Sequence, residues 1–320
     1  MTARDRAHAA GRAVFGADWS ATVEADAPGR VELLGNHVDD NGGRVLAGAI
    51  DRRVACIIDE RGGATLQVAF ADRPPISVGA LTVGDFADWR SPGAAPEPID
   101  YVRGVLATAS VRGLKIRSGA RLAVAGDVPI GFGLSSSAAL CVALTLALHR
   151  TAPSGPDLVL LAQEAEHRAG TPCGTMDQSA SVAGHVILYN AAPLGWIELK
   201  PDLGNLVFAV ADSGVSRSLA VSSYPARVKE SAQALALVRS ELGVAADSLA
   251  AVTPAQLRQV EQSDDRVFPA VLKRRVRHVV TEAGRVAIGV DALRASDWAT
   301  FGRLMNEFGE SSTHDSEVSH

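Results

Sequence analysis

Lysine and cysteine are scarce in this chain of 320 residues, and long apolar runs are absent. Lysine occurs only at positions 115, 200, 229 and 273, and the formal net charge is −5. The sequence therefore has no basic tract of the kind that binds nucleic acid. The three cysteines, Cys56, Cys141 and Cys173, lie far apart. That spacing argues against a disulfide framework or a clustered metal site, and it favours a reducing cytoplasm.

Segments suited to a membrane are also lacking. Residues 1–16 mix Arg, Asp and His with alanine and have no apolar core like that of a signal peptide. The most apolar stretch, Ala138–Leu148, is too short to span a bilayer. The hydrophobic content of 47% and the charged content of 21% are ordinary for a globular protein. We expect a cytoplasmic protein with neither membrane nor nucleic acid as a partner, and a monomer or a weak homodimer.

A loop rich in Gly and Ser is the most informative stretch that is present. It includes Pro129, Gly131 and Gly133, and it joins an apolar strand at 122–125 to a buried helix at 139–149. Unpaired backbone N–H groups and the helix dipole at such a place suit a phosphate. No Lys follows the second Gly, so the loop is not a Walker A motif. A capped turn that binds nothing is the alternative.

A second polar loop follows the short strand predicted at Val31–Leu34. Residues 35–43 read Gly-Asn-His-Val-Asp-Asp-Asn-Gly-Gly, and apolar residues resume at Val45–Ile50. Carboxylate and amide groups can hydrogen-bond several hydroxyls at once, so the loop is a candidate sugar site. A polar hairpin loop without a ligand is the alternative.

Three segments resemble the GHMP small-molecule kinases, and galactokinases most closely. The first is Pro-x-Gly-x-Gly-Leu-Ser-Ser-Ser-Ala from Pro129 onward. The second, 29–43, is similar to a Gly-Arg strand followed by Gly-Glu-His-Thr-Asp-Tyr-Asn-Gly-Gly, and the third, 173–178, to Cys-Gly-x-Met-Asp-Gln. The resemblance runs from about Phe15 to the last residue. It implies an α+β fold with a ribosomal protein S5 domain 2-like N-terminal domain at 1–185, an α/β C-terminal domain at 186–320, and an active site in the cleft between them.

The resemblance also implies an activity and its catalytic residues. The activity is ATP-dependent phosphorylation of the anomeric hydroxyl of a monosaccharide, galactose to galactose 1-phosphate, with Mg²⁺. Asp177 would be the catalytic acid/base and Arg30 its partner, offsetting charge on the transferring phosphoryl group. The alternative for Asp177 is a helix N-cap. Ser137 and Glu166 would be the Mg²⁺ ligands, a hydroxyl and a carboxylate.

The remaining binding residues come from the same resemblance. For ATP it implies Gly131, Phe132, Gly133, Leu134, Ser135, Ser136, Ser137 and Tyr101. For the sugar it implies Asn36, His37, Asp39, Gly174 and Tyr224. A core aromatic is the alternative for Tyr101. Cys173 is interpreted as a packing residue, because no His close in sequence supports thiol chemistry.

Two departures from the galactokinase pattern leave the sugar open. Asn36 replaces a Glu and Asp40 replaces a Tyr, so a uronic acid such as galacturonate is a second substrate hypothesis. The family's third glycine-rich motif is absent, because the glycines after Gly214 are isolated. We therefore also consider a non-catalytic sugar and ATP sensor, or a truncated remnant. The intact catalytic residues argue against it.

The second half of the chain is predicted to be mainly helical. A buried strand is expected at Leu206–Val210, and helices are expected at 226–242, 254–262, 268–294 and 297–310. Residues 273–275, Lys-Arg-Arg, are interpreted as a solvated face. The segment Arg277–Glu282 resembles galactokinases and is expected to lie outside the active site. In the first half, residues 72–98 are interpreted as a surface excursion.

Overall fold

The computed structural model describes residues 1–320 except 74–76, 85, 94–95, 213, 215–223 and 319–320. The chain divides into two compact units. Unit 1 comprises Met1–Val31 and Ala49–Gly184, and unit 2 comprises Glu32–Gly48 and His185–His320. Within the described residues, none of the helices combines the length and the apolar character that spanning a membrane requires.

Unit 1 is built on a mixed sheet. Its strands are β1 (Val23–Leu34), β2 (Arg44–Glu60), β3 (Thr65–Phe70), β4 (Ser77–Thr82) and β5 (Ala120–Gly126). Along the sheet the order is β4-β3-β5-β2, with β1 paired to β2. Strands β3 and β5 pair in parallel, whereas β2–β5 and β3–β4 are antiparallel. Strands and helices together confirm the predicted α+β class, and β4 is a strand within the predicted surface excursion.

The two faces of this sheet bury two separate sets of side chains. On β2, Cys56 and Ile58 belong to the large core under the helices, whereas Ala55 and Ile57 pack with the N-terminal helix. Strand β5 alternates in the same way along 122–125. Because successive strand residues point to opposite faces, a nearly continuous apolar run indicates a strand covered on both sides.

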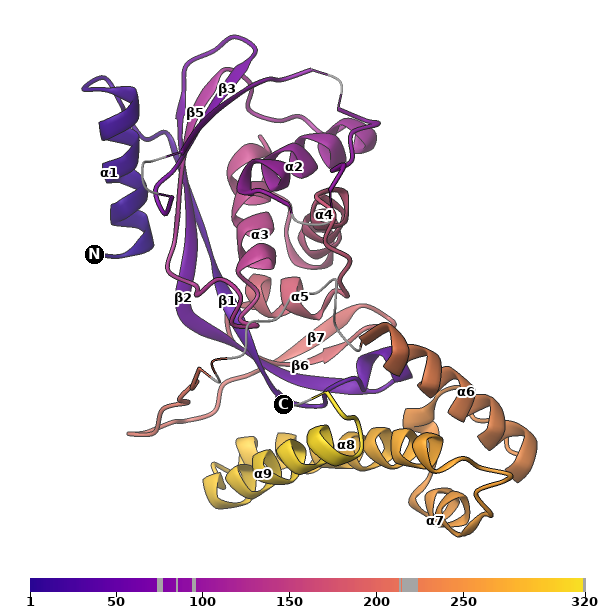
Figure 1. The fold of residues 1–320 in the computed structure, drawn as a ribbon. Helices are drawn as coiled ribbons and strands as arrows, with labels where there is room; N and C mark the ends of the chain where they lie inside the picture. The colour runs from indigo at the N-terminus through magenta and orange to yellow at the C-terminus, as the bar shows by residue number, and fades with distance from the viewer. Residues whose placement is uncertain (74–76, 85, 94–95, 213, 215–223, 319–320) are drawn as a thin grey trace. The chain divides into compact units, whose positions relative to one another are not determined.

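Five helices supply those covers. They are α1 (Ala3–Phe15), α2 (Pro98–Arg112), α3 (Ser136–Leu148), α4 (Gly155–Arg168) and α5 (Met176–Ala183). Helix α1 lies on one face of the sheet, and α2, α3 and α4 lie on the other (Figure 1). A capping box of Thr2 and Asp5 starts α1. Helix α3 is buried over most of its surface, in agreement with its apolar composition.

Helices α2 and α4 approach each other most closely at Gly104. A Cβ atom at this position would lie 2.3 Å from the backbone oxygen of Ala165. We therefore expect Gly104→Ala to lower the free energy of unfolding by about 1–3 kcal/mol, measured by urea denaturation. The matched control is Gly284→Ala on an open helix face, where a new Cβ meets no atom within 4 Å. That change should raise stability by up to about 1 kcal/mol. Equal effects of the two substitutions would contradict the close approach.

Unit 2 contains two further strands of the same sheet and most of the remaining helices. The Arg44–Gly48 end of β2 pairs with β6 (Val186–Asn190), which pairs with β7 (Gly195–Leu199), both antiparallel. The helices are η1 (Asp39–Asn41), α6 (Tyr224–Leu242), η3 (Leu249–Ala251), α7 (Pro254–Gln262), α8 (Ala270–Arg294) and α9 (Trp298–His314). Apolar residues of α6, η3, α7 and α8 form one core around the fully buried Phe268. Except at their ends, α6, α7, α8 and α9 follow the sequence prediction.

The prediction of a buried strand at Leu206–Val210 is wrong. Residues 206–210 form no strand in the structure, and Val207 is 85% exposed. Only Phe208 packs inward, with its ring centroid 6.1 Å from that of Phe301. The segment borders a hollow of about 320 Å³ that α9 lines through Trp298, Phe301 and Met305. An apolar run becomes a strand only where a neighbouring strand accepts its backbone hydrogen bonds, and these described residues have none.

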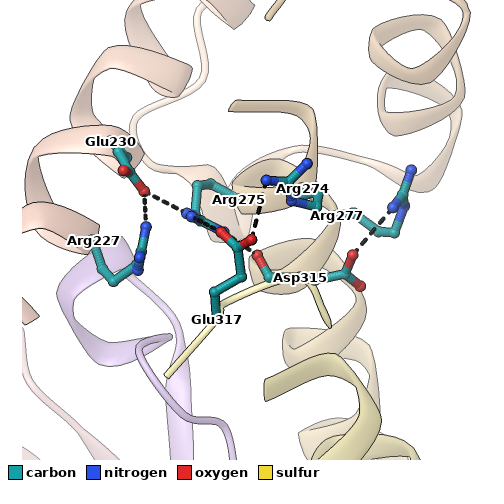
Figure 2. A network of polar contacts seen from close by, with 7 residues as sticks. All are labelled: Arg227, Glu230, Arg274, Arg275, Arg277, Asp315 and Glu317. Atoms are coloured by element: carbon teal, nitrogen blue, oxygen red, sulfur yellow. Dashed lines mark hydrogen bonds and ion pairs between the residues drawn. The ribbon is translucent and has the colours of Figure 1, made fainter. Parts of the chain in front are cut away.

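The interpretation of residues 273–275 as a solvated face is also wrong, because Arg275 is only 2% exposed. Its Nε donates to Glu230 Oε2 at 2.6 Å, and its Nη2 donates to Glu317 Oε2 at 2.6 Å. A third nitrogen, Nη1, donates to the backbone oxygen of Asp315. Figure 2 shows this guanidinium between acceptors from α6 and from the segment after α9. This charge can be buried because oxygen acceptors on several sides pair with the N–H donors of the planar guanidinium group.

Candidate active site

The Gly- and Ser-rich loop leaves the end of β5 and enters α3. Gly131 and Gly133 have φ values of +84° and +71°, and Ser135 has φ +57°. No side chain caps the start of α3, so backbone N–H groups of the helix start have no capping acceptor there. Positive φ values suit glycine, and they let the backbone turn sharply. The arrangement presents N–H groups and a helix dipole at one point, as an anion site requires.

Arg30 and Asp177 meet beside this loop although 147 residues separate them in the sequence. Arg30 Nε donates to Asp177 Oδ1 at 2.7 Å, and Arg30 Nη1 donates to the backbone oxygen of Gly133 at 2.7 Å. The Ser135 hydroxyl donates to Asp177 Oδ2. One carboxylate therefore joins a guanidinium and a loop hydroxyl, and the guanidinium also holds the loop backbone.

The backbone around Arg30 is fixed on two sides. Its N–H donates to the Leu134 oxygen at 3.1 Å, and the Ser181 hydroxyl of α5 donates to the Pro28 oxygen at 2.7 Å. A Cβ on Gly29 would lie 2.5 Å from that same Leu134 oxygen. Glycine at position 29 thus lets β1 lie directly against the loop, and Arg30 reaches Asp177 from this position.

Asp177 does not act as the N-cap of α5, which was the alternative for it. Thr175 stands at the N-cap position, and Asp177 lies in the first turn. Its two carboxylate oxygens accept from Arg30 and Ser135. The helix start still favours a negative side chain in the first turn, through its dipole.

Glu166 lies in a second polar cluster, within α4. Its side chain is only 2% exposed, and it accepts from the Ser137 hydroxyl and from Gln178 Nε2, the latter at 2.7 Å. Burial raises the pKa of Glu166 to about 7, although the Ser137 and Gln178 hydrogen bonds act in the opposite direction. Gln178 is fully buried, and its Oε1 has no hydrogen-bond partner in the structure. The cluster thus holds a carboxylate, a hydroxyl and an unpaired amide oxygen.

Gln178 is a site residue that the sequence analysis missed. Its signal was available, since Gln178 is the last residue of the Cys-Gly-x-Met-Asp-Gln motif. Its Nε2 also approaches Cys173 Sγ at 3.3 Å. Burial raises the pKa of the Cys173 thiol, which disfavours the thiolate and agrees with a packing role. Gly174, beside it, is exposed.

Tyr101 lies near the same cluster, on α2. Its hydroxyl is 3.2 Å from Thr171 Oγ1, and the side chain is partly buried. Burial raises the pKa of Tyr101 to about 12, so the hydroxyl stays protonated and can donate. Both alternatives for this residue, an aromatic of the core and a neighbour of a nucleotide, are compatible with this position.

The second polar loop, Gly35–Gly43, belongs to unit 2 and is called the sugar loop below. Asn41 Nδ2 donates to the His37 backbone oxygen at 2.7 Å, and the Gly43 N–H donates to the Val38 oxygen at 2.8 Å. Burial, together with the adjacent Asp40 carboxylate, raises the pKa of Asp39 to about 6. The internal hydrogen bonds give the loop a defined shape. The Tyr224 side chain lies outside the described part of the chain.

Two family models match the chain. The GHMP kinases N terminal domain matches residues 100–185, and the galactokinase galactose-binding signature matches residues 12–60. A galactokinase from Roseiflexus sp. (strain RS-1) is 38% identical over 306 residues, which cover 92% of this chain and 73% of the relative. The Homo sapiens galactokinase is 35% identical over 319 residues, which cover 96% of this chain and 77% of the relative.

Solved structures agree with these matches. The Lactococcus lactis galactokinase complexed with galactose has a TM-score of 0.79 and 25% sequence identity, covering 97% of this chain and 79% of that chain. The Methanococcus jannaschii mevalonate kinase has a TM-score of 0.57 at 15% identity, which shows a shared fold. The resemblance inferred from the three motifs is confirmed.

Proposed function

Because the chain belongs to the galactokinase family, we propose that it transfers the γ-phosphoryl group of ATP to the anomeric hydroxyl of galactose, giving galactose 1-phosphate. The observation that carries the proposal is the hydrogen bonding of Asp177 to both Arg30 and Ser135 at the Gly- and Ser-rich loop. An acid/base carboxylate, a cation and a phosphate-binding backbone are the parts that phosphoryl transfer needs.

Asp177 is the proposed proton acceptor. It takes the proton of the anomeric hydroxyl as that oxygen attacks the γ-phosphorus, while the bond from phosphorus to the bridging oxygen of ADP breaks. Arg30 steadies the carboxylate and offsets charge on the transferring group. Backbone N–H groups of residues 131–137 hold the ATP phosphates. Positioning and charge neutralisation supply most of the rate in such reactions.

We also propose a Mg²⁺ site at Glu166 and Ser137. The donor set fits the ion, because Mg²⁺ prefers oxygen ligands and keeps waters and phosphate oxygens in its shell. The buried, unpaired Gln178 Oε1 adds a further oxygen next to Glu166. When bound, the ion supplies charge neutralisation at the phosphates. The Glu166 carboxylate, with a pKa of about 7 without metal, would be held ionised by a neighbouring cation.

The sugar loop is the proposed source of sugar specificity. Asn36, His37 and Asp39 offer an amide, an imidazole and a carboxylate, which can hydrogen-bond several hydroxyls. A specific observation supports a second candidate substrate: Asn36 is neutral, so the loop lacks one negative charge that a carboxylate there would have. Galacturonate is therefore the alternative acceptor.

A coupled ADP-release assay with a panel of sugars tests the proposal. We expect sugar-dependent ADP release with the highest kcat/KM on galactose, compared with galacturonate, arabinose and glucosamine. Higher kcat/KM on galacturonate would select the alternative. The absence of sugar-dependent release with every sugar, in a folded protein that binds ATP, would reject the kinase activity.

A further inference from the structure

One face of α8 packs along the segment that leads from the end of β1 into the sugar loop. The residues on this face are His278, Glu282, Val286 and Gly289, spaced by four, four and three positions. A Cβ on Gly289 would lie 2.5 Å from Leu34 Cδ1, and a Cβ on Gly35 would lie 3.0 Å from Val286 Cγ2. The helix and the entry to the loop are therefore in direct contact. The stripe is apolar beside Leu34 and polar beside the loop.

His278 contacts the backbone of the sugar loop itself. Its side chain is buried, and its Nε2 lies 2.8 Å from the backbone oxygen of Asn36. Burial lowers the pKa of His278 to about 4, so the ring is neutral at neutral pH. A carbonyl can only accept, so Nε2 carries the proton and donates to Asn36. Nδ1 is then an acceptor, and the Ser311 hydroxyl at 2.8 Å donates to it.

Helix α9 holds Ser311, and the residues just after α9 are anchored to α8. Arg277 Nη1 contacts Asp315 Oδ1 at 3.1 Å, and Arg275 donates to the Asp315 backbone oxygen. Figure 2 shows both arginines converging on the segment of Asp315 and Glu317. Ser311 therefore lies four residues before Asp315, which two arginines of α8 hold in place. The hydrogen bonds that link Ser311, His278 and Asn36 thus begin at a residue whose position is fixed.

Glu282 lies one turn further along the same face and is fully buried. Burial raises the pKa of Glu282 to about 7, against the lowering effects of Arg285 and of the Gly35 backbone N–H. That N–H belongs to the residue before Asn36. The two polar side chains of the stripe therefore face the two ends of a single short stretch, Gly35–Asn36, which opens the sugar loop.

We propose that His278, backed by Ser311 and helped by Glu282, is a positioning residue for sugar binding: it fixes the Asn36 carbonyl and so orients the sugar loop. The effect on sugar binding rests on the proposed function. The segment Arg277–Glu282, expected from its sequence to lie outside the active site, then acts on the site through the loop backbone. Losing this hydrogen bond leaves the Asn36 carbonyl unpaired and loosens the loop, so the expected effect on sugar binding passes through the loop backbone.

The test compares His278→Ala with two other substitutions on α8. His278→Ala is expected to raise KM for galactose about tenfold, the value of one hydrogen bond, with kcat and KM for ATP much less affected. His278→Gln should recover part of the loss, because its amide N–H can donate to the same carbonyl. Val279→Ala is the matched control, since Val279 is equally buried but packs into the helical core. It should lower Tm without changing KM for galactose.

A second readout needs no catalysis. Hydrogen exchange of the Gly35–Gly43 amides should be faster in His278→Ala than in Val279→Ala, without sugar or ATP. If the two variants show equal exchange and equal KM for galactose, His278 is only a packing residue and the proposal is overturned. If wild type has no kinase activity but the exchange difference is present, the proposed function fails and the positioning role stands. Should His278→Ala not fold, Ser311→Ala provides the same comparison, with a smaller rise in KM.

Discussion

The Asp177→Asn variant is expected to fold like the wild type and to lose sugar-dependent ADP release by about 10²- to 10⁴-fold. Asparagine has almost the same shape as aspartate, and its amide oxygen can still accept from Arg30 or Ser135. It cannot take a proton from the sugar hydroxyl at neutral pH. The loss should therefore fall on kcat rather than on ATP binding, as measured by steady-state kinetics and by calorimetric titration with ATP.

Asp157→Asn is the matched control. Asp157 lies in the first turn of α4, as Asp177 lies in the first turn of α5, but it is exposed. Both substitutions remove one negative charge near a helix start, so both weaken the same dipole interaction. We expect Asp157→Asn to keep full activity. A turnover of Asp177→Asn close to that of the control would remove Asp177 from its catalytic role.

Arg30→Lys is expected to lower kcat about 10²-fold, a loss comparable to that of one preorganised donor in other active sites. The positive charge is retained, so the loss measures geometry. Arginine contacts Asp177 Oδ1 through Nε and Nη2 and the Gly133 carbonyl through Nη1, whereas a lysine ammonium is a single point on a flexible stem. An equal fall in kcat and kcat/KM would indicate an interaction that acts in the transition state.

Arg53→Lys serves as its control, since Arg53 Nε also pairs with a carboxylate, that of Asp26, at 2.7 Å in unit 1. It should leave kcat unchanged. If Arg30→Lys leaves kcat unchanged, as Arg53→Lys should, the guanidinium geometry has no special role and the positive charge alone is sufficient. If both variants lose activity together, the defect is one of folding, and the melting temperatures would show it.

The sequence predicts correctly those elements whose conformation is specified by their own residues. The apolar run at 122–125, the glycines after it and the alanine-rich segment from 139 each specify their own conformation, and the strand, loop and helix follow there. The joining of Arg30 to Asp177 is different, because no periodicity relates residues 147 positions apart. It was expected only because three motifs together resembled one family.

The sequence predicts poorly those residues whose surroundings are formed by segments far away in the sequence. Val207 belongs to an apolar run, and nothing in that run shows that no strand will pair with it. Arg275 sits in a basic triplet that suggests water, yet acceptors from residues 230 and 315–317 surround it. Burial of a charge depends on partners brought by tertiary structure, so a short window of sequence cannot reveal it.

The sugar loop has nine residues, Gly35–Gly43, between Leu34 at the end of β1 and Arg44 at the start of β2, and these two strands pair with each other. Arg30 lies on that same β1, four residues before its end. Inserting one residue into β1 would turn every following side chain to the opposite face. Exchanging a side chain in the loop, as at Asn36, leaves the register of β1 and the position of Arg30 in that strand unchanged.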